Sequence, residues 1–169
     1  MNLKRRIITV FVVLFATVAP LQLAHAEGVY FGVNLELVAG PLNTGRDFQV
    51  NLVPLPGLEI GYDFGDALKG FGIRAGVNTI LFVSHLFVDG FYRFVLDDTG
   101  SNAYLGLGYD NWSVAFSYGG LKNSFHALIG YEWRFNPAWA TSIEATPGLG
   151  LDFPAFLITI RAGLVWRPF

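Results

Sequence analysis

The sequence predicts an all-β fold, an eight-stranded antiparallel up-and-down barrel that spans a membrane, and three observations lead to this prediction. Hydrophobic residues make up 53% of the 169 residues and charged residues only 14%, too little polar surface to coat a water-soluble globule. Beyond the first 26 residues, no stretch approaches the roughly 18 to 20 consecutive apolar residues that a membrane-spanning helix needs. The apolar residues instead alternate with small or polar ones, as in the strands of a transmembrane β-barrel.

The first 26 residues predict a cleaved secretory signal peptide. Basic residues at 4–6 precede an apolar core at 7–19, and Ala-His-Ala at 24–26 is a small-x-small cleavage site. An uncleaved helical anchor is the alternative, but the apolar core is short for one. We therefore expect residues 27–169 to form one barrel domain. This domain has eight Lys and Arg against thirteen Asp and Glu, a net charge of −5, and nothing in it indicates a nucleic-acid partner.

The first four predicted strands lie at residues 29–38, 48–64, 71–81 and 88–96. In the first of these, the odd positions are aliphatic or aromatic, whereas the even positions include Gly32 and Glu36. The second contains Pro54 and Pro56, which cannot donate a hydrogen bond to a strand ladder and are therefore expected above the bilayer. The third and fourth strands alternate in the same way.

The last four predicted strands lie at 103–110, 125–135, 139–145 and 156–166. All eight are near the roughly 9 to 11 residues that a tilted membrane strand requires. The stretch 112–118 also alternates, and it is either an extra strand or a hairpin extension above the membrane. A ninth spanning strand would leave the C-terminus outside, so we expect the extension.

Connection lengths predict the orientation, because outer-membrane barrels have short periplasmic turns and longer external loops. The short connections at 65–70, 97–101 and 136–137 are expected in the periplasm with both termini. The longer connections at 39–47, 111–123 and 147–155 are expected outside. Ser84 and His85 are expected to form a very short external loop.

The charged residues favour a membrane barrel over a soluble, lipocalin-like one. A soluble barrel would turn its apolar parity inward, bury the charges among glycines, and leave an oily face in water. A membrane barrel places the same charges in its lumen, where they can neutralise one another. The predicted lumen charge network consists of Glu36, Glu59, Asp63, Arg74, Asp89, Arg93, Glu132, Arg134, Glu144 and Arg161.

The last strand carries a family resemblance. Residues 158–169 end in a C-terminal Phe, with an aromatic residue and a glycine upstream. With this strand, the whole mature chain resembles the small eight-stranded outer-membrane proteins, the OmpX, OmpA-transmembrane and opacity-type barrels. The resemblance implies that Trp166 and Phe169 belong to the signal that the barrel-assembly machinery reads during insertion. Pro168 is a departure, since it places these two aromatic residues on opposite parities.

One group of residues suggests catalysis, but the sequence favours a structural role for it. Ser124, His126 and Glu132 lie on the same face of one predicted strand. This arrangement suggests the hypothesis of a Ser/His/Glu hydrolase similar to the outer-membrane lipid A deacylases. The longer His-x-Ser-Asn type motif of those enzymes is absent, so we expect a lumen hydrogen-bond network instead. With His85 expected at a loop tip, His25 in the signal peptide and no cysteine in the chain, we predict neither a metal site nor a cofactor.

The predicted function is that of an integral protein of the cell outer membrane with a structural or surface-interaction role and no catalytic activity. The paired lumen charges are expected to plug the barrel, since side chains fill an eight-stranded interior. Trp112, Phe116 and Tyr118 are candidate external contacts for lipopolysaccharide, other outer-membrane lipids or an unknown ligand, or else upper rungs of the barrel. The alternatives are a lipid-modifying barrel enzyme, a narrow pore, or a barrel that binds a small ligand.

Overall fold

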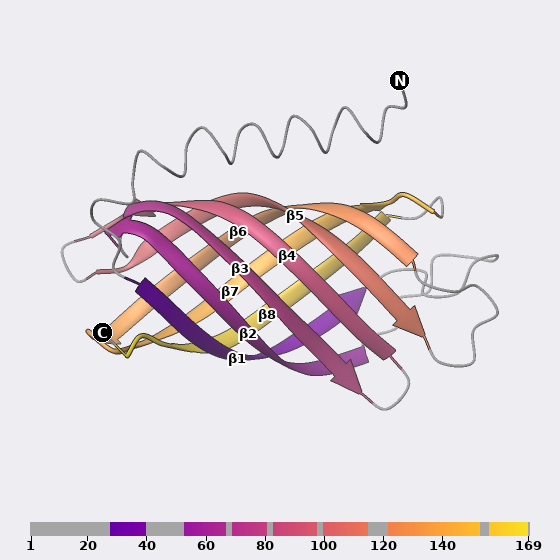
Figure 1. Cartoon of the computed structure of the whole chain (residues 1–169), viewed down its shortest axis with the longest axis horizontal. Helices are drawn as coiled ribbons and strands as arrows, with labels where there is room; N and C mark the ends of the chain where they lie inside the picture. Colours follow the sequence, from indigo (N-terminus) through magenta and orange to yellow (C-terminus); the bar gives the residue numbers. More distant parts are fainter. Residues whose placement is uncertain are drawn as a thin grey trace, which may run out of the picture.

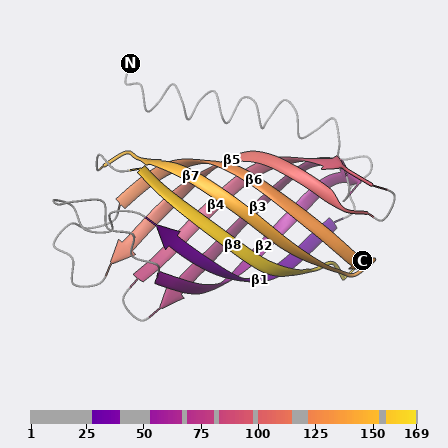
Figure 2. The ribbon, with the colours of Figure 1, turned by 180° about the vertical axis from the view of Figure 1, so that it is seen from behind.

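The structure is a computed structural model that describes residues 28–39, 53–66, 69–80, 83–97, 100–114, 122–152 and 156–168. It contains strands β1 (Gly28–Ala39), β2 (Val53–Asp66), β3 (Lys69–Ile80), β4 (Val83–Val95), β5 (Asn102–Val114), β6 (Lys122–Asn136), β7 (Trp139–Gly150) and β8 (Phe156–Trp166). Every strand pairs antiparallel with its sequence neighbours, and β8 pairs with β1, so the sheet closes (Figures 1 and 2). The predicted eight-stranded up-and-down barrel is confirmed. The proposed signal peptide lies outside the described residues.

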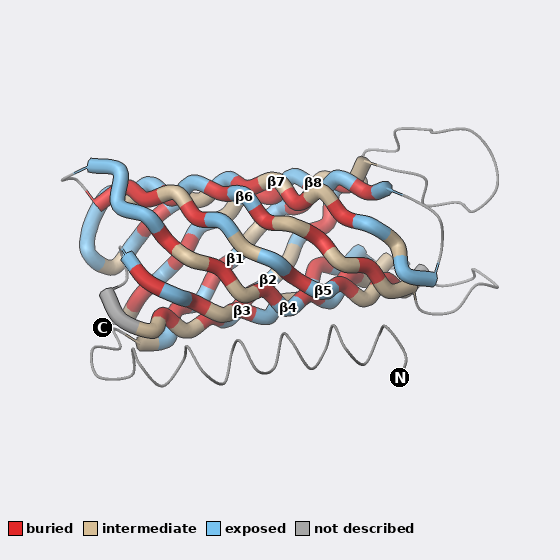
Figure 3. The backbone as a smooth tube through the Cα atoms, turned by 90° about the horizontal axis from the view of Figure 1, so that it is seen from above, coloured by how far each residue is buried: buried red, intermediate tan, exposed pale blue. Residues whose placement is uncertain are grey.

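The inward and outward faces of every strand are those that the sequence predicted. Along β1, for example, Glu36 is 0% exposed and faces the lumen, whereas its neighbour Leu35 is 49% exposed on the outer surface. Figure 3 shows this alternation as successive buried and exposed bands along the strands. The alternation follows from the two-residue period of a strand, which sends successive side chains to opposite faces. No helix among the described residues is long and apolar enough to cross a membrane.

The barrel has two distinct ends. At the terminal end, where β1 begins and β8 ends, the connections are short, as predicted. In the turn between β6 and β7, the Asn136 side-chain oxygen accepts hydrogen bonds from the backbone N–H groups of Ala138 and Trp139, both at 2.9 Å. Between β4 and β5, Gly100 has a φ of 90°, which favours glycine. We call the opposite end the distal end; which side of a membrane it faces stays a prediction.

Four strands continue further toward the distal end than their alternation indicated. The predicted loop at Ser84 and His85 is wrong: both residues lie in β4, where they pair with Thr79 and Asn78 of β3. Likewise β5 runs on to Val114, β6 begins at Lys122 and β7 ends at Gly150. At the ends of β4 and β6 the outward residues Ser84 and Asn123 are polar, which interrupts the alternation of apolar and polar residues while the backbone ladder continues. The continuation of β5 past Asp110 agrees, as far as Val114, with the hairpin extension expected at 112–118.

The two prolines of β2 lie where this strand has one neighbour only. Pro54 and Pro56 pair with Leu37 and Leu35 of β1, whereas β3 joins β2 only from Gly57 onward. A residue without an N–H group is tolerated in a ladder that is open on one side. Their height relative to a bilayer stays a prediction.

Large inward side chains fit because glycines face them. Tyr30 lies over Gly61 and Tyr104 lies over Gly130, and a Cβ atom at either glycine would overlap the tyrosine ring. One buried apolar cluster fills the terminal end, and it consists of Tyr30, Phe91, Tyr104, Leu128, Ala140 and Val165. A second, which we call the distal cap, consists of Val38, Leu55, Trp112 and Leu157, with Val53 and Val83 packed against it. The charged residues lie between and around these two clusters.

Candidate functional site

The polar lumen is the candidate site, because all ten charges predicted for it point inward. Nine of these side chains are buried, and Arg134 has a side chain 12% exposed near the terminal end. The structure adds Asp110, Arg167 and His85, which are also buried. Asp110 and Arg167 continue the inward parity of their strands and could have been found from it, whereas His85 was assigned to a loop.

Arg74 of β3 connects opposite walls of the barrel. Its Nε donates to Asp89 at 2.8 Å, and its Nη2 donates to both carboxylate oxygens of Glu144 at 2.7 and 2.8 Å. Its Nη1 lies 3.6 Å from Glu59, and the Tyr104 hydroxyl donates to Glu144 at 2.9 Å. A buried charge is costly unless it is paired and hydrogen-bonded, and here one guanidinium serves three carboxylates.

Arg161 of β8 has a similar role. Its Nη2 donates to Glu36 at 2.8 Å, and its Nη1 lies 2.7 Å from Glu144 and 3.9 Å from Asp89. The guanidinium carbon also lies 3.8 Å from the centroid of the Phe87 ring. Removed from water, this cation is stabilised by the aromatic face as well as by the carboxylates.

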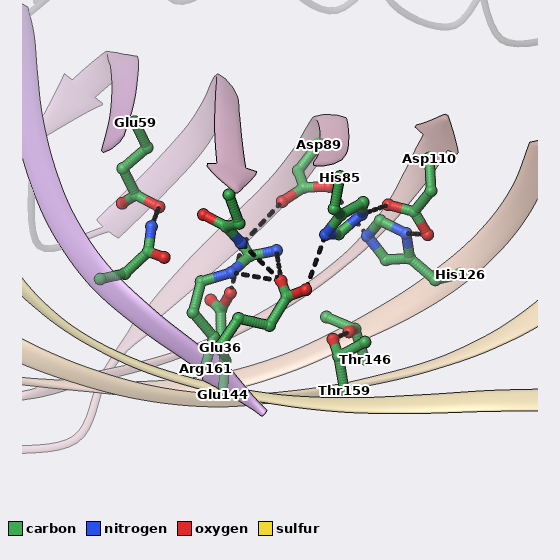
Figure 4. A network of polar contacts seen from close by, with 12 residues as sticks. Glu36, Glu59, His85, Asp89, Asp110, His126, Glu144, Thr146, Thr159 and Arg161 are labelled. Atoms are coloured by element: carbon green, nitrogen blue, oxygen red, sulfur yellow. Dashed lines mark hydrogen bonds and ion pairs between the residues drawn. The ribbon is translucent and has the colours of Figure 1, made fainter. Parts of the chain in front are cut away.

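Two histidines link three of the carboxylates in a row (Figure 4). His85 Nδ1 lies 2.8 Å from Glu36, and His85 Nε2 lies 2.7 Å from Asp110. His126 Nδ1 lies 2.7 Å from the other oxygen of Asp110, and His126 Nε2 lies 2.8 Å from Asp89. Arg161 joins Asp89 back to Glu36 and closes a cycle. We call this cycle the lumen ring; it consists of Glu36, His85, Asp110, His126, Asp89 and Arg161.

A second group of charges lies near the terminal end. Arg93 pairs with Asp63, and Arg167 donates to Glu132 at 2.9 Å and to Asp63 at 3.4 Å. Arg134 donates to Glu132 at 3.4 Å. We call this group the terminal cluster; it consists of Asp63, Arg93, Glu132, Arg134 and Arg167. All its cations are arginines, so its charge pattern does not change with pH in the physiological range.

The residues of the hydrolase hypothesis are not assembled into a triad. The Ser124 hydroxyl donates to Asp110 at 3.1 Å, and both nitrogens of His126 are taken by carboxylates. Glu132 belongs to the terminal cluster, where Arg167 binds it. Within the described strands the three residues therefore form parts of the lumen hydrogen-bond network. No group of three or more described Asp, Glu or His side chains could hold a metal ion.

Trp112 is an upper rung of the barrel, which is one of the two positions that the sequence analysis left open for it. The other alternative, an exposed external contact, is wrong for this residue, because Trp112 is 2% exposed inside the barrel, on the inward face of β5. Its ring stacks on His85, with centroids 3.8 Å apart and an angle of 3° between the planes. The reason is that the alternation of β5 continues past Asp110, which makes Trp112 an inward position. Phe116 and Tyr118 lie outside the described residues.

Trp166 lies on the outer surface at the terminal end. It is 40% exposed, and its ring lies 5.9 Å from Phe31 and 6.2 Å from Trp139. Phe169 lies outside the described residues. The assembly signal that the resemblance implies for these two aromatic residues therefore stays a prediction.

Fold and polarity together define a class: a closed eight-stranded barrel with charged residues inside and apolar residues outside. Neither a protein-family model nor a curated protein sequence matches the chain. The crystal structure of Neisserial surface protein A is similar to it, with a TM-score of 0.52 and 12% identity over 82% of this chain and 95% of that one. This similarity shows that the chain has the fold of the small eight-stranded outer-membrane barrels.

Two further solved structures resemble the chain less closely in shape. The N-terminal β-barrel domain of Pseudomonas aeruginosa OprF has a TM-score of 0.49 and 16% identity, over 84% of this chain and 100% of that one. Ail, the attachment invasion locus protein of Yersinia pestis, has a TM-score of 0.44 and 14% identity, over 82% of this chain and 95% of that one.

Proposed function

We propose that this chain is an integral barrel of the cell outer membrane with a structural or surface-interaction role and no catalytic activity. The observation that carries the proposal is the reversed polarity of the barrel. Thirty large hydrophobic side chains of the described residues are exposed on its outer surface, among them Leu58 at 62% and Ile129 at 57%. An apolar surface that surrounds the whole barrel is unstable in water and stable in lipid.

Aromatic residues at the terminal end support a membrane location. Outward rings pack edge to face there: the ring centroids of Phe71 on β3 and Tyr92 on β4 lie 4.9 Å apart, and those of Tyr92 and Phe94, both on β4, also lie 4.9 Å apart. Trp139 and Trp166 continue the group on β7 and β8. Transmembrane barrels carry such aromatic girdles at the membrane–water interfaces. Outer-membrane lipids, including lipopolysaccharide, are therefore the proposed surroundings of the barrel, and the barrel-assembly machinery is its proposed partner during insertion.

A plugged lumen is the second part of the proposal. The lumen ring, the terminal cluster and the two apolar clusters together occupy the interior, so a narrow pore is the less supported alternative. A small cavity of about 10 Å³, lined by Tyr30, Arg93 and Glu132 among others, has room for about one water molecule. Specific recognition, if the barrel has an external ligand, is then a property of its distal surface.

Cell fractionation followed by gel electrophoresis tests the location and the fold together. Unheated and boiled samples of the outer-membrane fraction are compared in detergent. We expect a membrane-bound band whose mobility shifts on boiling, because a closed strand ladder resists detergent until it is heated. Recovery in a detergent-free periplasmic extract, without a mobility shift, would show a soluble barrel and contradict the proposal.

The absence of catalysis needs a separate test. Lipid A from cells that lack the protein is compared with lipid A from cells with the wild-type protein or with the Ser124→Ala variant. We expect identical lipid A profiles in all three, since neither Ser124 nor His126 is free to act on a substrate. A profile that changes on deletion and again with Ser124→Ala, while the barrel remains folded, would restore the lipid-modifying enzyme.

A further inference from the structure

The histidine contacts of the lumen ring require more protons than neutral histidines supply. An ionised carboxylate only accepts hydrogen bonds, and a neutral imidazole donates from one nitrogen only. Yet His85 and His126 each have a carboxylate oxygen within 2.8 Å of both ring nitrogens. Four donating N–H groups satisfy this arrangement when each of the two imidazoles carries two protons and a positive charge.

The charge balance of the lumen leads independently to the same result. Seven described carboxylates point into it: Glu36, Glu59, Asp63, Asp89, Asp110, Glu132 and Glu144. Five arginines face them: Arg74, Arg93, Arg134, Arg161 and Arg167. The deficit of two positive charges equals the number of buried histidines. Lys122 lies half-buried at the distal rim of β6, and no described ion pair joins it to these groups.

Asp110 depends most on the histidines. Its described partners are His85, His126 and the Ser124 hydroxyl, and none of the arginines that the structure describes contacts it. Glu36 and Asp89, the outer carboxylates of the row, are each also paired with Arg161. If both histidines lost their charge, Asp110 would be the carboxylate left without a cation.

The charged groups around the imidazoles of His85 and His126 come from several strands of the barrel. Glu36 of β1 and Asp110 of β5 contact His85 directly, and Asp89 of β4 and Asp110 contact His126. Behind them lie Arg74 of β3 and Arg161 of β8. Glu59 of β2 and Glu144 of β7 face those two arginines rather than the histidines.

We propose that the lumen ring is a proton-operated lock on the distal half of the lumen. The lock is closed while His85 and His126 are both imidazolium, and loss of their protons opens it. A neutral imidazole turns a lone pair toward one of its two carboxylates, which breaks that contact and leaves Asp110 charged in a buried site without a neighbouring cation. Because Trp112 stacks on His85, movement of His85 also disturbs the distal cap.

Nuclear magnetic resonance of the full chain in detergent micelles tests the proposal directly. The imidazole nitrogens are labelled with nitrogen-15, and the His85→Gln and His126→Gln variants assign the signals. At neutral pH we expect the signature of a doubly protonated ring for both residues. A signal of a neutral imidazole for either residue at neutral pH would overturn the proposal. If an assignment variant fails to fold, the spectrum of His25→Gln decides this, because that protein contains only the two lumen histidines.

The Asp110→Asn variant tests whether the Asp110 charge, rather than burial alone, determines the protonation of the two histidines. Without the Asp110 charge, both histidines are expected to lose their second proton at a pH about one to three units lower than in the wild type. Asp63→Asn makes the same change in the terminal cluster and is expected to leave the histidine titration unmoved. Histidines that titrate alike in Asp110→Asn and wild type would contradict the lock. The test runs in micelles, so its result is independent of the proposed outer-membrane role.

Discussion

The lumen ring and the terminal cluster neutralise buried carboxylates with different cations. Both compensate carboxylates that are removed from water, but the terminal cluster uses three arginines, whereas the lumen ring uses one arginine and two histidines. Arginine stays charged at every physiological pH, and histidine is the side chain whose charge changes near neutrality. The comparison teaches that one end of this lumen has a fixed charge pattern, while the other depends on bound protons.

The largest expected effect is the loss of Arg161. Arg161→Met leaves Glu36 and Glu144 without their shared cation, and breaking a buried ion pair costs about 3 to 5 kcal/mol. The free energy of unfolding, measured by urea titration of the barrel in lipid vesicles, is expected to fall by that amount. Arg134→Met is the matched control in the terminal cluster. Arg134 lies at the rim with its side chain 12% exposed, so we expect about 1 kcal/mol or less.

Equal losses from Arg161→Met and Arg134→Met would show that the two groups of charges are equally solvated. That result would remove the distinction between a closed distal half and a partly open rim.

The next largest effect on stability is expected when the Trp112 side chain is removed from the distal cap. Trp112→Ala deletes a buried side chain that stacks on His85, and we expect a loss of about 3 kcal/mol in the free energy of unfolding, followed by circular dichroism. Trp139→Ala is the control on the outer surface. This residue is 38% exposed and packs mainly on Trp166, so about 1 kcal/mol is expected. A larger effect of Trp139→Ala would contradict the burial of Trp112.

Two glycines beside His126 differ in the space that surrounds them, so alanine substitutions at them test how tightly the lumen ring is packed. A Cβ at Gly108 would overlap the His126 ring and the Asp89 carboxylate, whereas a Cβ at Gly148 would lie 3.3 Å from the Cβ of His126. Gly108→Ala is therefore expected to destabilise the barrel by about 1 to 3 kcal/mol, as overpacking does. Gly148→Ala is expected to change stability by less. Thermal unfolding of both variants measures the difference, and the reverse order would contradict the position of His126.

The smallest expected effect is that of the Ser124 hydroxyl. Ser124→Ala removes one hydrogen bond to Asp110, which the two histidines continue to hold, so about 0.5 to 1.5 kcal/mol is expected. Urea unfolding measures it. An effect as large as that of Arg161→Met would mean that Ser124, and not the imidazoliums, is the main partner of Asp110.

The two faces of the barrel could be predicted from the sequence, because a strand has a strict two-residue period. Glu36 and Leu35 are assigned to opposite faces by that period alone. Strand ends could not be predicted in the same way. Outward polar residues such as Ser84 and Asn111 interrupt the pattern, although Ser84 bonds to Thr79 at 2.9 Å and Asn111 bonds to Asn123 at 2.9 Å.

The composition of the lumen charges was predictable, but their connections were not. Inward parity identified Asp89 and Glu36 as lumen residues, yet 53 positions separate them along the chain, and the row of histidines that joins them depends on how the sheet closes. Because His85 was assigned to a loop, the sequence analysis could not place it in this row. Parity continued through residues 83–114 would have placed His85 and Trp112 inside.

Electrical conductance of the purified barrel in a planar lipid bilayer at neutral pH tests the central claim, a membrane-spanning barrel whose lumen is filled by its own neutralised charges. The account predicts insertion, verified by protease protection of the strands, without a steady ionic current. A sustained current through the inserted wild-type barrel at neutral pH would contradict it, because such a current requires a continuous water path past the lumen ring and the terminal cluster.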